Sequence, residues 1–179
     1  MSAFEEVVIT GVGVCSPLGH TAADLMQALC RGESALRPID AFDVRPFACQ
    51  TGAAVTGFKA GDWVSNRKNL KLMSRAVRYG LAAMKRAWAD GALDQATLDP
   101  ERVGMFVGAG TAMGDSGDLL PALAQGFVGE RFDLSTFAAA GVPRINPLWL
   151  LKGLSNNALG FGSADLDARG VNQNYCNSA

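Results

Sequence analysis

The 179 residues are enough for one ordinary domain or for half of a larger fold, and 49% of them are apolar, which favours a folded core. With 16 basic and 17 acidic residues the net charge is −1, so no global field attracts nucleic acid or an anionic membrane. The first six residues hold two acids and no base, and no apolar run approaches the ~20 residues of a membrane span. We therefore expect a cytoplasmic protein that binds neither nucleic acid nor membrane.

The first elements are predicted from a β-branched run and a capping pair. Residues 7–10 form the run and predict a strand. Thr21, with Asp24 three residues later, predicts the start of a helix with an apolar face, and Gly32 predicts its end. Residues 34–63 are punctuated by proline and glycine and predict an irregular excursion with a strand only near residues 53–55.

The clearest periodicity follows this excursion. Six apolar residues recur every three or four positions and predict one stripe of a core helix that ends at Gly91: Leu70, Met73, Val77, Leu81, Met84 and Trp88. Residues 103–108 predict a buried strand, followed by a glycine-rich turn over residues 108–114.

The remaining pattern continues the alternation of helix and strand. Residues 119–127 predict a helix despite Pro121, which we expect in its first turn. Residues 147–160 predict another helix, and residues 170–179 a strand. Alternating strands and helices indicate an α/β sandwich with buried strands.

Three smaller features carry competing interpretations. Gly11 and Gly13 follow the first predicted strand and leave open a nucleotide-binding α/β domain, although Ser16 stands where a third glycine would be expected. The single histidine, His20, is interpreted as a solvated residue near a helix start rather than a base. The cysteines lack the close pairs of zinc or redox sites, so we predict no metal and buried, reduced thiols: Cys15, Cys30, Cys49 and Cys176.

Several segments, in order along the chain, resemble one known family. They are residues 8–14 with the Ser16-Pro17-Leu18-Gly19 turn, then residues 66–75, 102–110, 154–160 and 170–172. Together they are similar to the N-terminal half of β-ketoacyl carrier-protein synthases of the thiolase-like superfamily. The resemblance implies a thiolase-like α/β sandwich of layered helices and mixed sheet, with residues 1–179 as its N-terminal half and the C-terminal half absent from this chain.

The resemblance also bears on catalysis. In the family the nucleophilic cysteine lies nine residues after the glycine that corresponds to Gly170, and that position here is Ala179. Two catalytic histidines belong to the family's second half. The family consists of acyltransferases, but this chain by itself then has no catalytic residue and resembles a chain length factor of fatty acid or polyketide biosynthesis. An active synthase whose cysteine lies just beyond Ala179 stays open as the alternative, and Cys176 is the less favoured nucleophile.

The same resemblance implies partners and binding residues. Arg67, Lys68 and Lys71 correspond to positions that meet acyl carrier protein, the alternative being a solvated helix face. Thr111 and Met113 correspond to positions near the acyl pocket and subunit interface, the alternative being ordinary turn residues. The implied partners are an active ketosynthase subunit in a heterodimer, acyl carrier protein and the complementary C-terminal half. No resident cofactor is implied, because phosphopantetheine arrives on the carrier protein.

Overall fold

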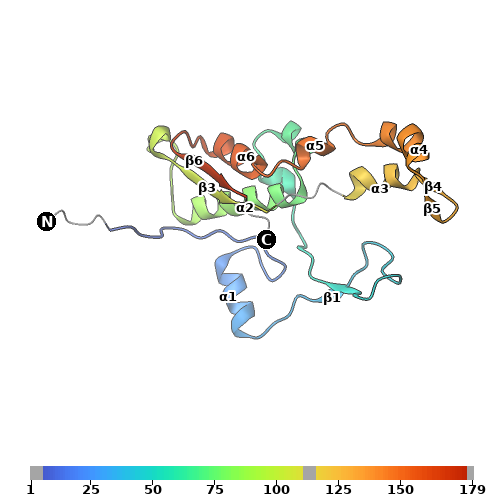
Figure 1. Ribbon diagram of the computed structural model, residues 1–179. Coiled ribbons are helices and arrows are strands. Elements are labelled where there is room, and N and C mark those ends of the chain that lie inside the picture. The colour runs from blue at the N-terminus through green and yellow to red at the C-terminus, as the bar shows by residue number, and fades with distance from the viewer. Residues whose placement is uncertain (1–5, 111–115, 177–179) are drawn as a thin grey trace.

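The computed structural model describes residues 6–110 and 116–176, and their helices and strands confirm the α/β class (Figure 1). The helices of this part are α1 (Ala22–Cys30), α2 (Arg75–Asp90), α3 (Ser116–Ala124), α4 (Leu134–Thr136), α5 (Trp149–Lys152) and α6 (Asn157–Leu166). Its strands pair two by two: β1 (Arg37–Pro38) with β2 (Thr51–Gly52), β3 (Met105–Gly108) with β6 (Asn172–Tyr175), and β4 (Phe127–Val128) with β5 (Arg131–Phe132).

The β3–β6 pair is the centre of the fold. The two strands are parallel, with Met105 opposite Asn172 and Gly108 opposite Tyr175, and α6 packs on both of them. These strands confirm the predictions for residues 103–108 and for the described part of residues 170–179. They are less buried than expected, because Phe106 is 61% exposed and only Val107 of β3 is buried.

Helix α2 supplies the largest share of the core. The predicted stripe is confirmed within α2, where Val77 is buried and Leu81 is fully buried, whereas Met73 is fully buried but precedes the helix. The helix starts later than Leu70 because the Ser74 hydroxyl accepts a hydrogen bond from the Val77 amide and caps it there. Residues Arg67–Leu72 instead form a 3₁₀ helix. The buried cluster and its half-buried neighbours are Val64, Met73, Val77, Leu81, Leu70, Ala158 and Phe161.

A charged network ties α2 to α6. Lys85 Nζ lies 2.7 Å from Asp165 Oδ2, and the Ser65 hydroxyl donates to the same oxygen at 3.1 Å. Burial raises the pKa of Asp165, but the hydrogen bonds from Lys85 and Ser65 together outweigh it and leave that pKa below its ordinary value. The carboxylate therefore stays ionised at neutral pH and holds the two helices in register.

The strand predicted for residues 7–10 does not form. Val7 and Ile9 are 95% and 88% exposed, and no described strand runs beside them to complete a ladder of hydrogen bonds. The following residues lie against α2 instead, where a Cβ at Gly11 or Gly13 would collide with the helix backbone. Local β propensity is overridden here because a strand needs a partner.

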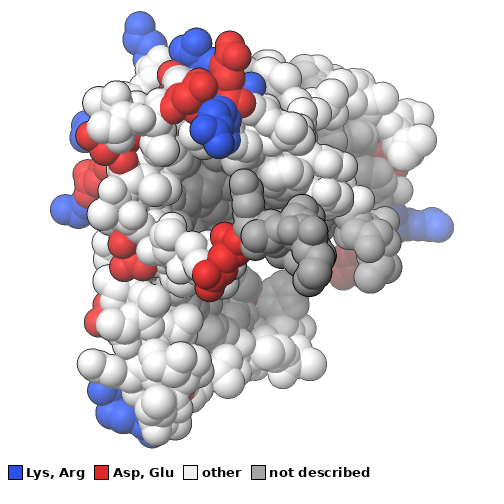
Figure 2. Space-filling view, turned by 90° about the vertical axis from the view of Figure 1, so that its left-hand side faces the viewer, with Lys and Arg blue, Asp and Glu red and all other residues white. Residues whose placement is uncertain are grey.

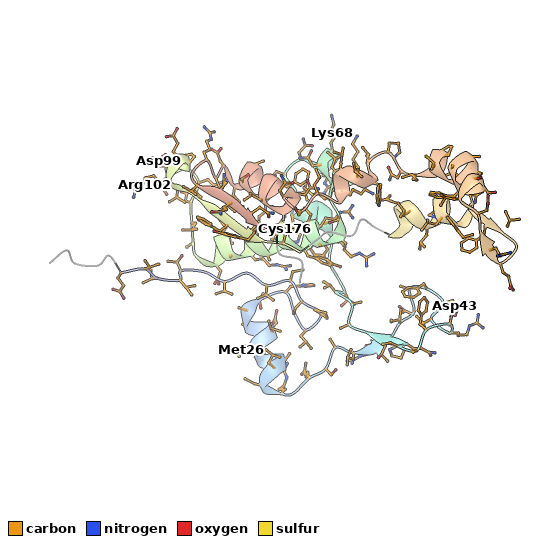
Figure 3. All side chains as sticks on the ribbon, in the orientation of Figure 1. Met26, Asp43, Lys68, Asp99, Arg102 and Cys176 are labelled. Carbon is orange, nitrogen blue, oxygen red and sulfur yellow. The ribbon has the colours of Figure 1, made fainter. Side chains whose placement is uncertain are left out.

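The first helix and the excursion after it follow the sequence in part. The Thr21 hydroxyl accepts from the Asp24 amide and Gly32 has φ +66°, so both predicted ends of α1 are confirmed. Its apolar face is uncovered, with Met26 and Leu29 61% and 55% exposed, and Figure 3 shows Met26 on α1 below the β3–β6 pair. The strand predicted near residues 53–55 is wrong, since β2 ends at Gly52.

Residues 116–146 form an arm that Figure 1 shows at the opposite end of the molecule from the N-terminal segment. The arm contains α3 and the β4–β5 hairpin, and three of its aromatic rings pack together. The Phe132 ring centroid lies 5.3 Å from that of Phe127, in an edge-to-face arrangement, and 5.5 Å from that of Phe137, in a tilted one. The helix predicted for residues 119–127 is confirmed only in part. It starts at Ser116, so Pro121 lies inside it rather than in its first turn, and it ends at Ala124, so that Phe127 belongs to β4.

The helix predicted for residues 147–160 is two helices. α5 ends at Lys152, with Gly153 as its C-cap, and α6 starts at Asn157 and continues to Leu166. The Asn157 side chain donates to the Leu151 carbonyl at 2.6 Å, which adds a side-chain donor to a carbonyl that the Leu154 amide also contacts at 3.4 Å. The break turns the chain, so that Leu151 and Leu154 are 47% and 45% exposed instead of buried.

The arm is tied to α5 by one polar cluster, and we expect acid to loosen it. The Lys152 ammonium, 2.7 Å from Asp118, lowers the pKa of that carboxyl below its ordinary value, and burial opposes this less strongly. Because the folded-state pKa is the lower one, the stabilisation is complete above the unfolded value of about 3.9 and is lost as pH falls through the folded value. Trp149 fluorescence, measured in a protein with Trp63→Phe and Trp88→Phe, should report a loosening of α5 in that range.

The control for this titration is Asp118→Asn, which keeps the side-chain shape and removes the ionisable group. In this variant, the Trp149 fluorescence should no longer change as the pH is lowered below 5. An identical titration in both proteins would show that another group controls the arm.

The cysteines are free thiols as predicted, but their predicted burial is wrong in the described part of the chain. Cys30, Cys49 and Cys176 are exposed and Cys15 is half-buried, and all four are free thiols. The reason is that Cys30 ends the uncovered helix α1, while Cys176 directly follows the last residue of β6.

Within residues 6–110 and 116–176, no helix is both long and apolar enough to cross a membrane.

Candidate functional site

The candidate site is a cleft of about 520 Å³ between α2, the end of β3 and the segment that opens α6. Its described walls are almost entirely apolar: Ala76, Val77, Gly80, Met84, Phe106, Val107, Gly108, Ala109, Gly110, Leu154, Ser155 and Ala158. This volume lies within the range of small-molecule sites, which are typically apolar concavities.

The sequence builds the walls of this cleft from small residues. Ala76, Gly80 and Met84 recur every four positions and therefore share one face of α2. A Cβ at Gly80 would meet only the Ala158 Cβ of α6, at 4.0 Å, so the two helices leave a space between them there. The residues Gly108 to Gly110 keep the end of β3 free of bulky side chains.

The described lining of the cleft can bind but offers little chemistry. Ser155 is the one lining residue with a hydroxyl, and none of the described lining residues is titratable. His20 lies in another cavity, with Trp63 and Arg86, and its Nε2 is 2.8 Å from the Thr56 carbonyl oxygen. His20 is therefore half-buried and hydrogen-bonded, which corrects its interpretation as a solvated residue. It lines a different cavity from Ser155.

Three of the predicted site residues, Thr111, Met113 and Ala179, lie outside the described residues. Gly110, the neighbour of Thr111 in sequence, does line the cleft. Cys176 is described, and Figure 3 shows it at the end of β6. Its thiol is exposed, so the interpretation as a buried small hydrophobe is wrong.

The predicted basic residues are all exposed on the 3₁₀ helix that precedes α2. The Asn66 side chain caps this helix by accepting from the Lys68 amide at 3.1 Å, while Leu70 packs against the core. Lys68 and Lys71 are three residues apart and so share one side of a 3₁₀ helix. Within the described part of the chain, neither these lysines nor Arg67 forms an ion pair.

Arg75 extends this basic segment and was missed by the sequence prediction. It is the exposed first residue of α2, whose first turn contains no acidic residue. The N-terminus of a helix carries a partial positive charge, which does not neutralise the charge of an arginine placed there. The electrostatic potential around Arg75 is therefore positive. The signal was available, because Arg75 directly follows the Ser74 cap in the same basic stretch.

The basic segment differs from other charged parts of the surface. Figure 3 shows Lys68 projecting outward, away from Asp99 and Arg102. Figure 2 shows the face nearest Asp99 and Arg102, where blue and red side chains are intermixed and much of the surface is uncharged. The basic segment is thus a local positive patch on a nearly neutral protein.

A family model described as "Beta-ketoacyl synthase, N-terminal domain" matches residues 4–157. The chain belongs to the β-ketoacyl synthase family. It is 30% identical over 93% of its length to 3-oxoacyl-[acyl-carrier-protein] synthase 2 of Coxiella burnetii and covers 37% of that protein. It is 27% identical over 94% of its length to the Synechocystis protein of the same name and again covers 37%. The chain thus spans little more than a third of these family relatives.

Solved structures of this family share the fold. "The ishigamide ketosynthase/chain length factor" matches with a TM-score of 0.74 and 26% identity, over 94% of this chain and 39% of that one. A chain from a solved complex, described as a type II polyketide acyl carrier protein with its ketosynthase, matches with a TM-score of 0.64 and 18% identity, over 93% of this chain and 40% of that one, which supports the fold alone. The family of thiolase-like ketosynthases is therefore confirmed for this chain.

The positions of Gly11 and Gly13 in the structure do not support the alternative of a nucleotide-binding domain, which these two glycines had suggested. Such a domain directs its glycine loop at a helix N-terminus, where a pyrophosphate binds. Gly11 and Gly13 instead lie against Ala83 and Ala87 in the body of α2. They serve close packing of the N-terminal segment on a β-ketoacyl synthase helix.

Proposed function

We propose that this chain is a noncatalytic, chain-length-factor-like subunit of fatty acid or polyketide biosynthesis that shapes the acyl pocket of an active ketosynthase. The cleft carries the proposal, because its described lining is apolar and contains one hydroxyl and no titratable group. Such a cavity binds an alkyl or polyketide chain by burying apolar surface. It has no described group that could act as an acid or base on a thioester.

Two further observations support an inert subunit. The sequence resemblance assigns the nucleophile's position to Ala179, and a methyl group cannot form a thioester. Among the solved structures, the ketosynthase/chain length factor matches this chain with a TM-score of 0.74. In this role the active subunit would carry the acyl group, and this chain would limit its length by shape.

The proposed partners are an active ketosynthase subunit and an acyl carrier protein. The carrier protein would dock on Arg67, Lys68, Lys71 and Arg75, whose charges suit an acidic surface. Ala76 directly follows this basic segment and lines the cleft, so the docking surface adjoins the proposed acyl site. Phosphopantetheine would arrive on the carrier protein, and no resident cofactor is proposed.

An active β-ketoacyl synthase is the second candidate. The 30% identity to the 3-oxoacyl-[acyl-carrier-protein] synthase 2 of Coxiella burnetii favours it, because that identity extends over 93% of this chain. In that case a cysteine just beyond Ala179 would carry the acyl group and catalyse a decarboxylative Claisen condensation.

Filling the cleft tests the shape-determining role. In the complex with its ketosynthase and carrier protein, Gly80→Leu would place a side chain between α2 and Ala158, where the Cβ itself fits without collision. The added side chain would reduce the cavity volume by about that of several methylene groups. We therefore expect shorter acyl products, with chain lengths measured by mass spectrometry.

The matched control is Gly160→Leu, which changes a helix glycine in α6 whose Cβ would meet nothing within 4 Å. It should leave the product length unchanged. The same product distribution from a correctly folded Gly80→Leu complex would contradict the proposed role of the cleft.

A further inference from the structure

A polar cluster, here the Asp118 cluster, joins the arm to α5. Asp118 Oδ1 accepts from Asn146 Nδ2 at 2.6 Å, and Asp118 Oδ2 lies 2.7 Å from Lys152 Nζ. The side chains of Asp118 and Lys152 are each only 12% exposed. Both carboxylate oxygens are thus used, and the two charges compensate each other where water reaches them poorly.

The cluster lies close in sequence to one wall of the cleft. The chain passes from Lys152 to Leu154, which lines the cleft, within two residues. The contact between Asp118 and Lys152 therefore holds the chain directly before this wall.

Besides this cluster, α5 is held by the hydrogen bond that the Asn157 side chain donates to the Leu151 carbonyl, and its own residues are poorly buried. It is four residues long and none of them is buried, and Leu150 and Leu151 are 67% and 47% exposed. A helix this short is not stable by its own hydrogen bonds. Its position, and that of Leu154 just after it, must depend on side-chain anchors such as Lys152.

We propose that Asp118 and Asn146 act as positioning residues that hold Lys152, and through α5 fix the Leu154–Ser155 wall of the cleft. This inference rests on the proposed function in one respect, namely that the cleft is the acyl site. The cluster makes no contact with the acyl group itself. It sets the width of the site by fixing one of its walls.

Hydrogen exchange of the full chain tests the clamp without reference to activity. Lys152→Met keeps the length of the side chain but removes its charge, and it should speed exchange of the α5 amides, including those of Lys152 and Gly153, by about tenfold or more. Exchange in β3 and β6 should not change. Reversing the pair, with Asp118→Lys and Lys152→Asp together, should restore much of the protection.

The matched control is Lys85→Met, which breaks another 2.7 Å ion pair, between α2 and α6, with side chains 22% and 9% exposed. It should leave the α5 amides unchanged. Unaltered α5 exchange in Lys152→Met, or equal loss of protection in Lys85→Met, would overturn the clamp.

A binding measurement links the clamp to the cleft. Dodecanoyl-N-acetylcysteamine, a small acyl thioester, should bind several-fold more weakly to Lys152→Met than to the unchanged chain or the charge-reversed pair. Equal affinity for all three would overturn the effect on the cleft. The proposed acyl site fails separately if Gly80→Leu leaves binding of this thioester unchanged, while the exchange result still decides the clamp.

Discussion

Replacing Leu81 with alanine is expected to lower the free energy of unfolding by about 2–5 kcal/mol, the usual cost of a core leucine. Leu81 is fully buried in the cluster that joins α2 to the 3₁₀ helix before it and to α6. The loss combines the transfer free energy of the three side-chain carbons that are removed with the cavity left between two helices. Urea unfolding followed by circular dichroism measures it.

Leu120→Ala is the matched control for this substitution. Leu120 lies in α3 and is 59% exposed, so its truncation should change the free energy of unfolding by no more than about 0.5 kcal/mol. If Leu81→Ala and Leu120→Ala lower the free energy of unfolding by the same amount, the core is not centred on α2.

Reversing two charges of the basic segment is expected to weaken carrier-protein binding by about 10- to 100-fold at low salt. The change combines Lys68→Glu with Lys71→Glu, two exposed side chains on one side of the 3₁₀ helix. The dependence of affinity on salt should weaken as well, because fewer attractive charges are left to screen. Titration calorimetry at two salt concentrations, with the complete protein and its carrier protein, provides the measurement.

A pair with the same change in net charge serves as control. Arg102→Glu with Arg131→Glu reverses two exposed arginines outside the basic segment, and Arg102 lies well away from Lys68 in Figure 3. Binding should fall little in this variant. An equal fall in both would mean that net charge, and not a docking surface, controls the association.

The elements that could be predicted from sequence are those whose determinants are local. The helix at α1 starts at Thr21 because that side chain caps it, and the stripe around Leu81 needs only helical geometry to share one face. The strand β3 follows from its apolar run, whereas β6, with the polar sequence Asn172–Tyr175, was expected only from the alternation of strands and helices. The structure pairs the two in parallel.

The elements that could not be predicted depend on contacts between distant segments. Residues 7–10 have strand propensity but no described neighbour to pair with, and the helix predicted across residues 147–160 breaks where Asn157 binds the Leu151 carbonyl. The link between Asp118 and Lys152 joins positions 34 residues apart and leaves no local pattern. Single-sequence periodicity contains none of this information.

The site divides in the same way. Arg67, Lys68 and Lys71 were assigned by family resemblance, and the structure exposes all three beside the residue that begins the cleft wall. The walls themselves, such as Gly80 facing Ala158, were not predicted, because a space between two helices is a property of their packing. Small residues at Ala76 and Gly80 on one helical face were the available signal.

The most direct test of the account is the location of the acyl group in the complete assembly during turnover. Peptide mapping by mass spectrometry, after incubation with acyl carrier protein loaded with a fatty acyl chain, identifies the cysteine that carries the thioester. We predict that this cysteine belongs to the partner ketosynthase and that this polypeptide carries no acyl group. An acyl thioester on a cysteine of this polypeptide, whether Cys176 or one beyond Ala179, would contradict the inert, pocket-shaping role.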